Sequence, residues 1–258
     1  TLENTPKVVS GIDEASLAKV KAFFDRVVET TVPVSSPREA ELTKLLENTF
    51  RHVNIALVNE LAMFAHDLGI NVWEAIDAAS TKPFGYMRFT PGPGVGGHCL
   101  PVDPSYLSWQ VKRSLGTSFR FVDLANDVND HMPDYVVRRL AAALNRECKA
   151  VNGSRILLLG LAYKKNTGDA RETPSRPIAR QLQQLGAEVR AVDPHVMDRD
   201  IPPGVISVDL DAEELSAADA VVLLVDHDEF DYDLVRQTPG YLLDTRAKLP
   251  AGGCVERL

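Results

Sequence analysis

The chain has 258 residues, of which 45% are hydrophobic and 25% are charged, values that are normal for a globular protein. Its formal charge of −8 and the lack of a basic stripe argue against a general affinity for nucleic acid or for an anionic membrane. The sequence has no apolar run of 18 or more residues and no basic-then-apolar leader, so neither a membrane span nor a signal peptide is expected.

The cysteines Cys99, Cys148 and Cys254 form an odd set without a CxxC pair. This usage suits the reducing cytoplasm better than a disulfide framework, and it argues against a metal site. We therefore expect a cytoplasmic protein without a bound metal. The chain opens on Thr1 rather than Met, inside a polar run, which favours a fragment of a longer protein.

Helical periodicity dominates the first 150 residues. It predicts helices at 13–28, 38–68, 71–79, 103–114 and 123–146. Asp13 is expected to cap the first helix, and Pro37 and Gly69 to bound the long second one. Pro133 is expected to divide the last helix into two.

The pattern changes at the turn signal of residues 151–154, which is the predicted domain boundary. Short apolar runs beyond it predict strands at 155–160, 188–192, 205–208, 220–225 and 241–243. Helices are predicted between them at 174–185, 211–217 and 231–237. Strands that alternate with helices imply a parallel, doubly wound sheet. The predicted fold class is thus α plus α/β, a helical domain over residues 1–150 followed by a Rossmann-like domain over 151–258.

Glycine and proline fill most of the loop of residues 89–98, which ends at Cys99. Such a loop lets a ligand reach the backbone and the thiol together, although an ordinary turn with an inert cysteine is the alternative. A nucleophilic Cys99 needs activation, which the helix expected to start at Asp103 would favour. His98 is a weak candidate for a hydrolase base because adjacent side chains usually point apart. Asp103 is either a helix cap or a group that orients a lysine or a water.

Lys44, Asn48 and Arg51 are spaced by four and three residues, so they form one stripe on the long helix. Leucine, valine and phenylalanine on the neighbouring faces suggest that much of this helix is buried, and a polar stripe there would need partners. The alternative is a solvated face with an exposed pair between Glu47 and Arg51.

The loop of residues 160–171 follows the first strand of the predicted sheet, where doubly wound folds bind nucleotides. It lacks a GxGxxG fingerprint, and Lys164, Lys165 and Arg171 would hold a phosphate by charge. Arg246, after a late strand of the same sheet, could add a second phosphate contact. A solvated loop is the alternative.

Together these segments resemble the UDP-glucose/GDP-mannose dehydrogenase family of nucleotide-sugar 6-dehydrogenases. The resemblance rests on the helix text of residues 41–61, on Gly96-Gly97-His98-Cys99 and on residues 164–169, which occur in the family's order. It implies that residues 1–150 are the helical central domain that builds a homodimer, and that 151–258 are the UDP-binding domain. The family's N-terminal NAD-binding Rossmann domain is missing, so the isolated chain is expected to be inactive.

The resemblance also implies roles for single residues. In the family the C6 alcohol of the sugar is oxidised twice with NAD, and Cys99 matches the nucleophile that forms a thiohemiacetal and then a thioester. Lys44 and Asn48 match residues that stabilise oxyanions, and Asp103 matches the aspartate that positions the lysine and the hydrolytic water. Arg171 matches a residue that reaches NAD. Substrate contacts carry over to Lys44, Asn48, Arg51, Gly96, Tyr163, Lys164 and Arg246.

The form Gly-Gly-His-Cys of residues 96–99 looks more like family members that act on UDP-N-acetylhexosamines, with UDP-N-acetylglucosamine 6-dehydrogenase the most similar, than like UDP-glucose enzymes. Residues 81–85 point the same way. UDP-glucose 6-dehydrogenase remains an alternative. A non-catalytic module for dimerisation and nucleotide binding is a second, and a cysteine hydrolase is a distant third.

Overall fold

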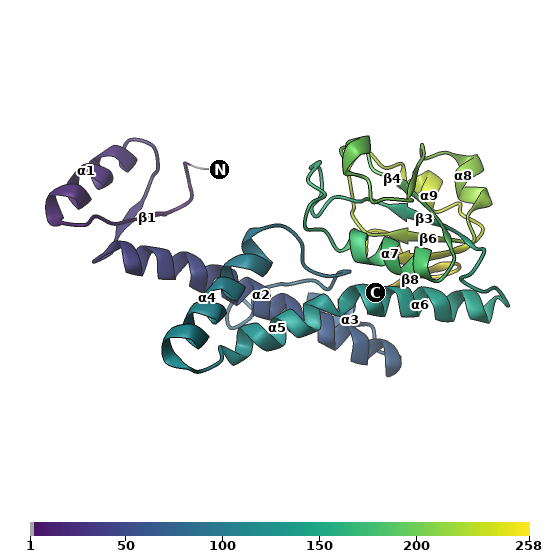
Figure 1. Cartoon of the computed structure of the whole chain (residues 1–258), viewed down its shortest axis with the longest axis horizontal. Helices are drawn as coiled ribbons and strands as arrows, with labels where there is room; N and C mark the ends of the chain where they lie inside the picture. Colours follow the sequence, from purple (N-terminus) through teal and green to yellow (C-terminus); the bar gives the residue numbers. More distant parts are fainter. Residues whose placement is uncertain (1–2) are drawn as a thin grey trace. The chain divides into compact units, whose positions relative to one another are not determined.

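The computed structural model describes residues 3–258 and divides the chain into two compact units, Thr1–Arg51 and His52–Leu258. A small βαβ motif occupies the first unit: β1 (Lys7–Val9), α1 (Glu14–Phe24) and β2 (Thr31–Pro33), the two strands pairing in parallel (Figure 1). Asp13 caps α1 as predicted, because its side chain accepts a hydrogen bond of 2.6 Å from the Ser16 N–H. The helix ends four residues before the predicted end, where Asp25 binds the side chains of Lys21 and Thr31. The two strands were not predicted.

Helix α2 (Pro37–Asp67) contains 31 residues and is shared between the two units. Pro37 starts it and Gly69 ends it, as predicted. Gly69 has a φ of +68°, and the Ile70 N–H donates 2.7 Å to the Ala65 carbonyl, which together close the last turn.

Four further helices complete the helical region: α3 (Val72–Ala79), α4 (Cys99–Leu115), α5 (Arg120–Asp130) and α6 (Met132–Arg146). The break between α5 and α6 lies where Pro133 predicted it. Helix α4 begins at Cys99, four residues before the predicted start, so the prediction that Asp103 caps this helix is wrong. Pro101 lies in the first turn, where its missing N–H has no helical partner, and Pro104 removes only one bond.

The second half of the chain forms a sheet of six parallel strands in the order β5-β4-β3-β6-β7-β8. Its strands are β3 (Arg155–Leu159), β4 (Glu188–Val192), β5 (Ile206–Ser207), β6 (Ala220–Leu223), β7 (Tyr241–Asp244) and β8 (Val255–Arg257). Its helices are α7 (Ser175–Gln184), the 3₁₀ turn η1 (Asp198–Asp200), α8 (Ala212–Ala217) and α9 (Tyr232–Val235). The predicted doubly wound sheet is confirmed, and only β8 was missed. The strand order reverses between β3 and β6, so the carboxyl ends there form the crevice at which such folds bind ligands.

Both faces of this sheet are covered, which explains why β3 is apolar and buried after its first residue, Arg155. Ile156 and Leu158 belong to one buried cluster, and Leu157 and Leu159 belong to another. Alternate residues of a strand point to opposite faces, so a strand between two helical layers needs no polar position.

Helix α6 runs along the sheet domain and joins its core (Figure 1). Leu140 and Leu144 pack in the same cluster as the strands, and the buried Arg139 donates to the Glu256 carboxylate at 3.0 Å and to the Arg257 carbonyl at 3.1 Å. These contacts hold α6 against the sheet. Among the described residues, no helix combines the length and apolar character needed to cross a membrane.

Candidate functional site: a cationic cleft beside a glycine-rich loop

The glycine- and proline-rich loop before α4 is held in place by the buried side chain of Asn59. Asn59 of α2 is fully buried, and its side-chain oxygen accepts the Gly92 N–H at 2.9 Å. Its amide nitrogen donates to Asn129 of α5, also at 2.9 Å. The loop is therefore tied to two helices through a structural asparagine, and its course is fixed before any ligand binds.

Two glycines of this loop touch the segment that follows β3. The Gly97 N–H donates to the Glu172 carbonyl at 2.7 Å, and its φ is +84°. A Cβ on Gly97 would lie 2.8 Å from the Tyr163 ring, and one on Gly96 would lie 2.6 Å from the Glu172 oxygen. These glycines are needed because two backbone segments pass each other here, a reason that sequence reasoning did not supply.

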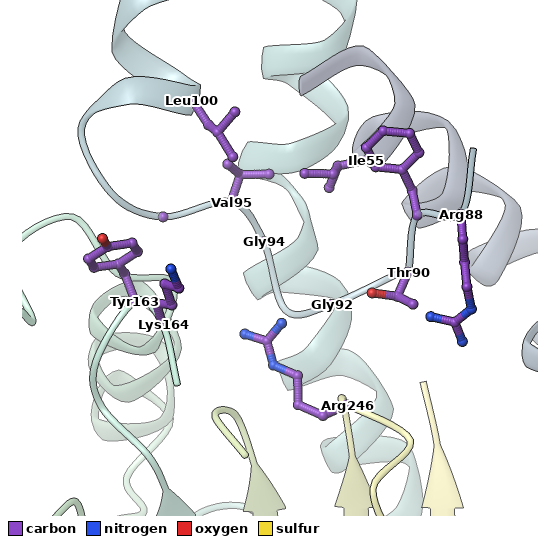
Figure 2. A pocket seen from close by; sticks show the side chains of 12 residues that line it. Ile55, Arg88, Thr90, Gly92, Gly94, Val95, Leu100, Tyr163, Lys164 and Arg246 are labelled. Carbon is purple, nitrogen blue, oxygen red and sulfur yellow. The ribbon is translucent and has the colours of Figure 1, made fainter. Parts of the chain in front are cut away.

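A cleft of about 350 Å³ opens between the loop and the carboxyl edge of the sheet. It is lined by Ile55, Arg88, Phe89, Thr90, Gly92, Gly94, Val95, Gly96, Leu100, Tyr163, Lys164 and Arg246. Figure 2 shows Arg246 pointing at the glycine loop, with Tyr163 and Lys164 on one side and Arg88 on the other. Four of the predicted substrate contacts, Gly96, Tyr163, Lys164 and Arg246, thus border one cleft.

Arg246 extends from the end of β7 into this cleft. Its Nε donates to the Leu224 carbonyl at 2.7 Å, and its Nη1 lies 3.0 Å from where a Cβ on Gly92 would be. Burial lowers the pKa of its guanidinium, and Asp226 and Asp244 oppose that shift. Because arginine stays protonated in proteins, the half-buried side chain keeps a poorly hydrated positive charge, which favours an anion.

The charges that border the cleft are all positive. Lys164 is exposed at one wall, and Arg88 at the other is held by Asp77 at 2.8 Å. No carboxylate of the described chain lines the cleft. Arg88 precedes the glycine-rich loop in the sequence, and the course of that segment brings its side chain to the wall of the cleft.

Cys99 is the first residue of α4 and is exposed, and the next residue, Leu100, lines the cleft. The free N–H groups of the first helical turn point toward this end of the helix. Asp103 lies one turn further along the same helix, on the side of Cys99. Cys99 is therefore not buried, and its role as a nucleophile stays a prediction.

Lys44, Asn48 and Arg51 lie on α2 within the first compact unit, whereas the cleft and Cys99 belong to the second. Lys44 is exposed and Asn48 is buried, and the Arg51 guanidinium donates to the side-chain oxygen of Asn48. That these residues converge with Cys99 remains a prediction.

Arg171 is exposed and does not line the cleft. It forms a bidentate pair with Asp169, at 2.8 Å and 3.0 Å, and this pairing holds the pKa of the Asp169 carboxyl well below its usual range. Its predicted contact with NAD stays a prediction.

Apolar side chains are exposed along helices α2, α4 and α5. The stripe on the second-unit part of α2 repeats every three to four residues, at Leu57, Leu61 and Phe64, and Leu68 continues it in the turn after the helix. Large exposed residues on the neighbouring helices are Tyr106, Trp109, Phe121 and Leu124. Exposed apolar side chains gathered on neighbouring helices are typical of an interaction surface. The expectation that much of the circumference of α2 is buried is not met at these apolar positions within one chain.

Two family descriptions match the chain. The central domain of the UDP-glucose/GDP-mannose dehydrogenase family matches residues 38–131, and the UDP binding domain of that family matches residues 157–250.

Relatives of known name are 34% to 38% identical to the chain over the aligned residues. A UDP-N-acetyl-D-mannosamine dehydrogenase of Methanococcus maripaludis is 34% identical over 229 residues, 89% of this chain and 51% of that protein. An NDP-N-acetyl-D-galactosaminuronic acid dehydrogenase of Ralstonia solanacearum is 38% identical over 250 residues, 95% of this chain and 56% of that protein. The chain thus spans about half the length of the curated relatives it matches.

Among solved structures, the UDP-D-ManNAc dehydrogenase of Pyrococcus horikoshii is similar with a TM-score of 0.83 and 30% identity. The similarity covers 99% of this chain and 60% of that one.

Proposed function

Because the chain belongs to the UDP-glucose/GDP-mannose dehydrogenase family, through its central and UDP-binding domains, we propose that it is the part of an NAD-dependent nucleotide-sugar 6-dehydrogenase that binds the UDP-sugar and carries the nucleophile. The observation that supports this most is the cleft with Lys164, Arg246 and Arg88 on its walls and the N-terminus of α4 beside it. A diphosphate matches this arrangement, because arginine binds phosphate oxygens through paired N–H groups and lysine adds a compact charge.

Cys99 is the proposed nucleophile. Its thiolate adds to the C6 aldehyde of the half-oxidised sugar, which gives a thiohemiacetal. Loss of a hydride converts the thiohemiacetal into a thioester, and water then releases the carboxylate and the thiol. NAD would accept the hydride in each of the two oxidations.

Lys44 and Asn48 are proposed to stabilise the negative oxygen of these intermediates, and Arg51 to contact the substrate beside them. Asp103, one helical turn after Cys99, is proposed to orient Lys44 and the hydrolytic water.

The described residues do not build a dinucleotide site of the usual kind. In a doubly wound sheet the pyrophosphate rests on N–H groups after the first strand. Here the Leu161 and Ala162 N–H groups both donate to the Asp193 carboxylate, at 2.6 Å and 3.0 Å. We therefore expect NAD to be held mainly by the part of the relatives that this chain does not span, with Arg171 as the contribution of the chain.

The sugar is proposed to be a UDP-N-acetylhexosamine. The relatives named above act on N-acetylated sugars according to their names, and the Gly-Gly-His-Cys form of the loop agrees with them. The manno epimer is then as good a candidate as the gluco epimer, and UDP-glucose is the alternative. A panel of these three UDP-sugars, assayed with the full-length protein for two NADH per sugar, separates them. Replacement of Cys99 by serine should abolish the second oxidation.

The exposed apolar stripe of α2, with its neighbours on α4 and α5, is proposed to form a homodimer in the cytoplasm. Covering it removes apolar surface from water, which drives association. A second copy of the chain presents the same stripe, as a two-fold interface requires.

Titration calorimetry of this chain with UDP tests the proposed binding site. Binding supports the cleft as a nucleotide site, and no binding contradicts it as a site built by this chain. A non-catalytic dimerisation and nucleotide-binding module would bind UDP equally well. Turnover by the full-length protein distinguishes the enzyme from that module.

A further inference from the structure

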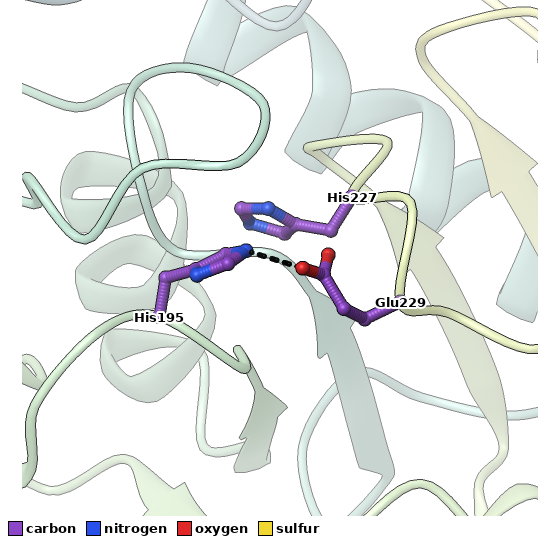
Figure 3. Close-up of side chains that lie close together, drawn as sticks. All are labelled: His195, His227 and Glu229. Atoms are coloured by element: carbon purple, nitrogen blue, oxygen red, sulfur yellow. Dashed lines mark ion pairs between the residues drawn. The ribbon is translucent and has the colours of Figure 1, made fainter.

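His195, His227 and Glu229 form a cluster at the carboxyl edge of the sheet, with ligand atoms within 4.8 Å of one another (Figure 3). His227 is fully buried, and its nitrogens are both in use. Nδ1 accepts the Asn166 N–H at 3.0 Å, and Nε2 lies 3.1 Å from an Asp193 oxygen. An accepting Nδ1 places the proton on Nε2, which then donates to Asp193. No lone pair of His227 is left for a cation, so another role explains its burial better.

Asp193, at the end of β4, holds the first residues of the loop 160–171. Its carboxylate accepts the N–H groups of Leu161, Ala162, His195 and Val196, besides the His227 ring. Burial alone would raise the pKa of this carboxyl, but the hydrogen bonds from His227 and from the backbone hold it well below its usual range. The carboxylate is therefore ionised and saturated with donors.

The later part of the same loop is fixed through Asn166. This residue has a φ of +56°, and its N–H is the group that His227 accepts. Its side chain exchanges two hydrogen bonds with Asp228, at 2.7 Å and 3.1 Å, and Lys165 pairs with the same carboxylate at 2.6 Å. A left-handed asparagine costs free energy and persists where its surroundings compensate.

The loop of residues 160–171 is thus fixed at two points, by Asp193 near its start and through Asn166 further along. His227 is the one described side chain that is hydrogen-bonded to both Asp193 and Asn166. Tyr163 and Lys164 lie between these fixed points, and both line the cleft. We propose that His227 is a positioning residue that holds this loop so that Tyr163 and Lys164 face the nucleotide. The proposal rests on the proposed function for its consequence, a gain in UDP affinity.

The experiment compares two replacements of His227 with a control in the same domain. His227→Leu removes both hydrogen bonds. His227→Gln retains an oxygen that can accept from Asn166 and an N–H that can donate to Asp193. Thr238→Val is the control, because it removes a buried hydrogen bond to the Leu215 carbonyl, 3.3 Å long, at the other side of the domain. UDP affinity is measured by calorimetry, and backbone order by amide hydrogen exchange.

His227→Leu should weaken UDP binding by about tenfold, because the loop then spends only a fraction of its time in the binding geometry. Exchange should accelerate at residues 161–166 and stay slow in β3, β6 and β7. His227→Gln should stay within about threefold of wild type, and Thr238→Val should lower stability without changing affinity. If His227→Leu does not fold, UDP affinity and hydrogen exchange are measured on His227→Asn instead. Its side chain keeps an acceptor for Asn166 but is too short to reach Asp193.

Two results would overturn the proposal: a UDP affinity of His227→Leu within twofold of the Thr238→Val control, or exchange that rises equally over the whole sheet. If the wild-type chain does not bind UDP, the proposed function fails at this point. Hydrogen exchange of His227→Leu then tests separately whether His227 fixes the loop. Faster exchange confined to residues 161–166 supports this role, and unchanged exchange refutes it.

Discussion

Replacement of Arg246 by methionine should weaken UDP binding strongly while it leaves the fold intact. The guanidinium is half-buried at the floor of the cleft, and within the part of the chain that the structure describes only its Nε is bound, to the Leu224 carbonyl at 2.7 Å. Its remaining N–H groups face the space beside Gly92. A hydrogen bond between charged groups contributes about 1.5–3 kcal/mol, so the loss corresponds to about a 10- to 150-fold higher Kd for UDP.

Stability should change little in the same variant. Removing a partly desolvated charge is favourable, and losing one hydrogen bond to the Leu224 carbonyl is unfavourable. Each effect is of the order of 1 kcal/mol, so the free energy of unfolding in urea should stay within about 1 kcal/mol of wild type. Arg180→Met is the matched control, because it makes the same charge change on the exposed face of α7.

Calorimetry with UDP and with uridine provides the decisive comparison. Uridine lacks the diphosphate, so its affinity for the Arg246→Met variant should equal that for wild type. The reasoning is refuted if UDP binds the variant within twofold of wild type, or if uridine loses as much affinity as UDP does.

Three more predictions concern the loop, the apolar stripe and a buried histidine. Gly97→Ala should destabilise the chain by about 1–3 kcal/mol more than Gly85→Ala, because both glycines have positive φ but only Gly97 packs on an aromatic ring; equal losses in urea unfolding would contradict this. Phe64→Asp should shift the chain from dimer to monomer in light scattering, whereas Leu185→Asp, an equally exposed site on the sheet domain, should not. Burial lowers the pKa of His52 below its usual value of 6.5. As the pH falls through this value, the unfolded chain therefore binds more protons than the folded chain does. The free energy of unfolding should therefore fall between about pH 7 and 5, and His52→Gln should flatten that fall.

The sequence predicted most helices and strands because their ends carry clear signals. Pro37 and Gly69 bound α2, and the buried strands read as continuous apolar runs. Elements of three residues, β1, β2 and β8, carry too little pattern to be recognised. The start of α4 was misplaced because Pro101 and Pro104 look like helix boundaries, although a first turn tolerates proline.

The candidate site was predictable where its residues directly follow predicted strands and not where they lie on irregular segments. Lys164 and Arg246 follow strands of one parallel sheet, so both lie at its carboxyl edge. Arg88 and His227 could not be found this way. Arg88 reaches the cleft through the course of an irregular segment, and His227 acts on a loop 61 residues earlier in the chain.

The glycine-rich loop has to meet two structural requirements. It must pass close to the segment after β3, for which Gly96 and Gly97 leave room, and it must end on the helix that carries Cys99. A rigid loop meets the second demand only if the segment it packs on is itself fixed. Asp193 and His227 fix that segment. Cys99, the cleft and the loop of residues 160–171 are thereby linked through packing and hydrogen bonds. A substitution at His227 should therefore change the geometry of the cleft, although His227 does not line it.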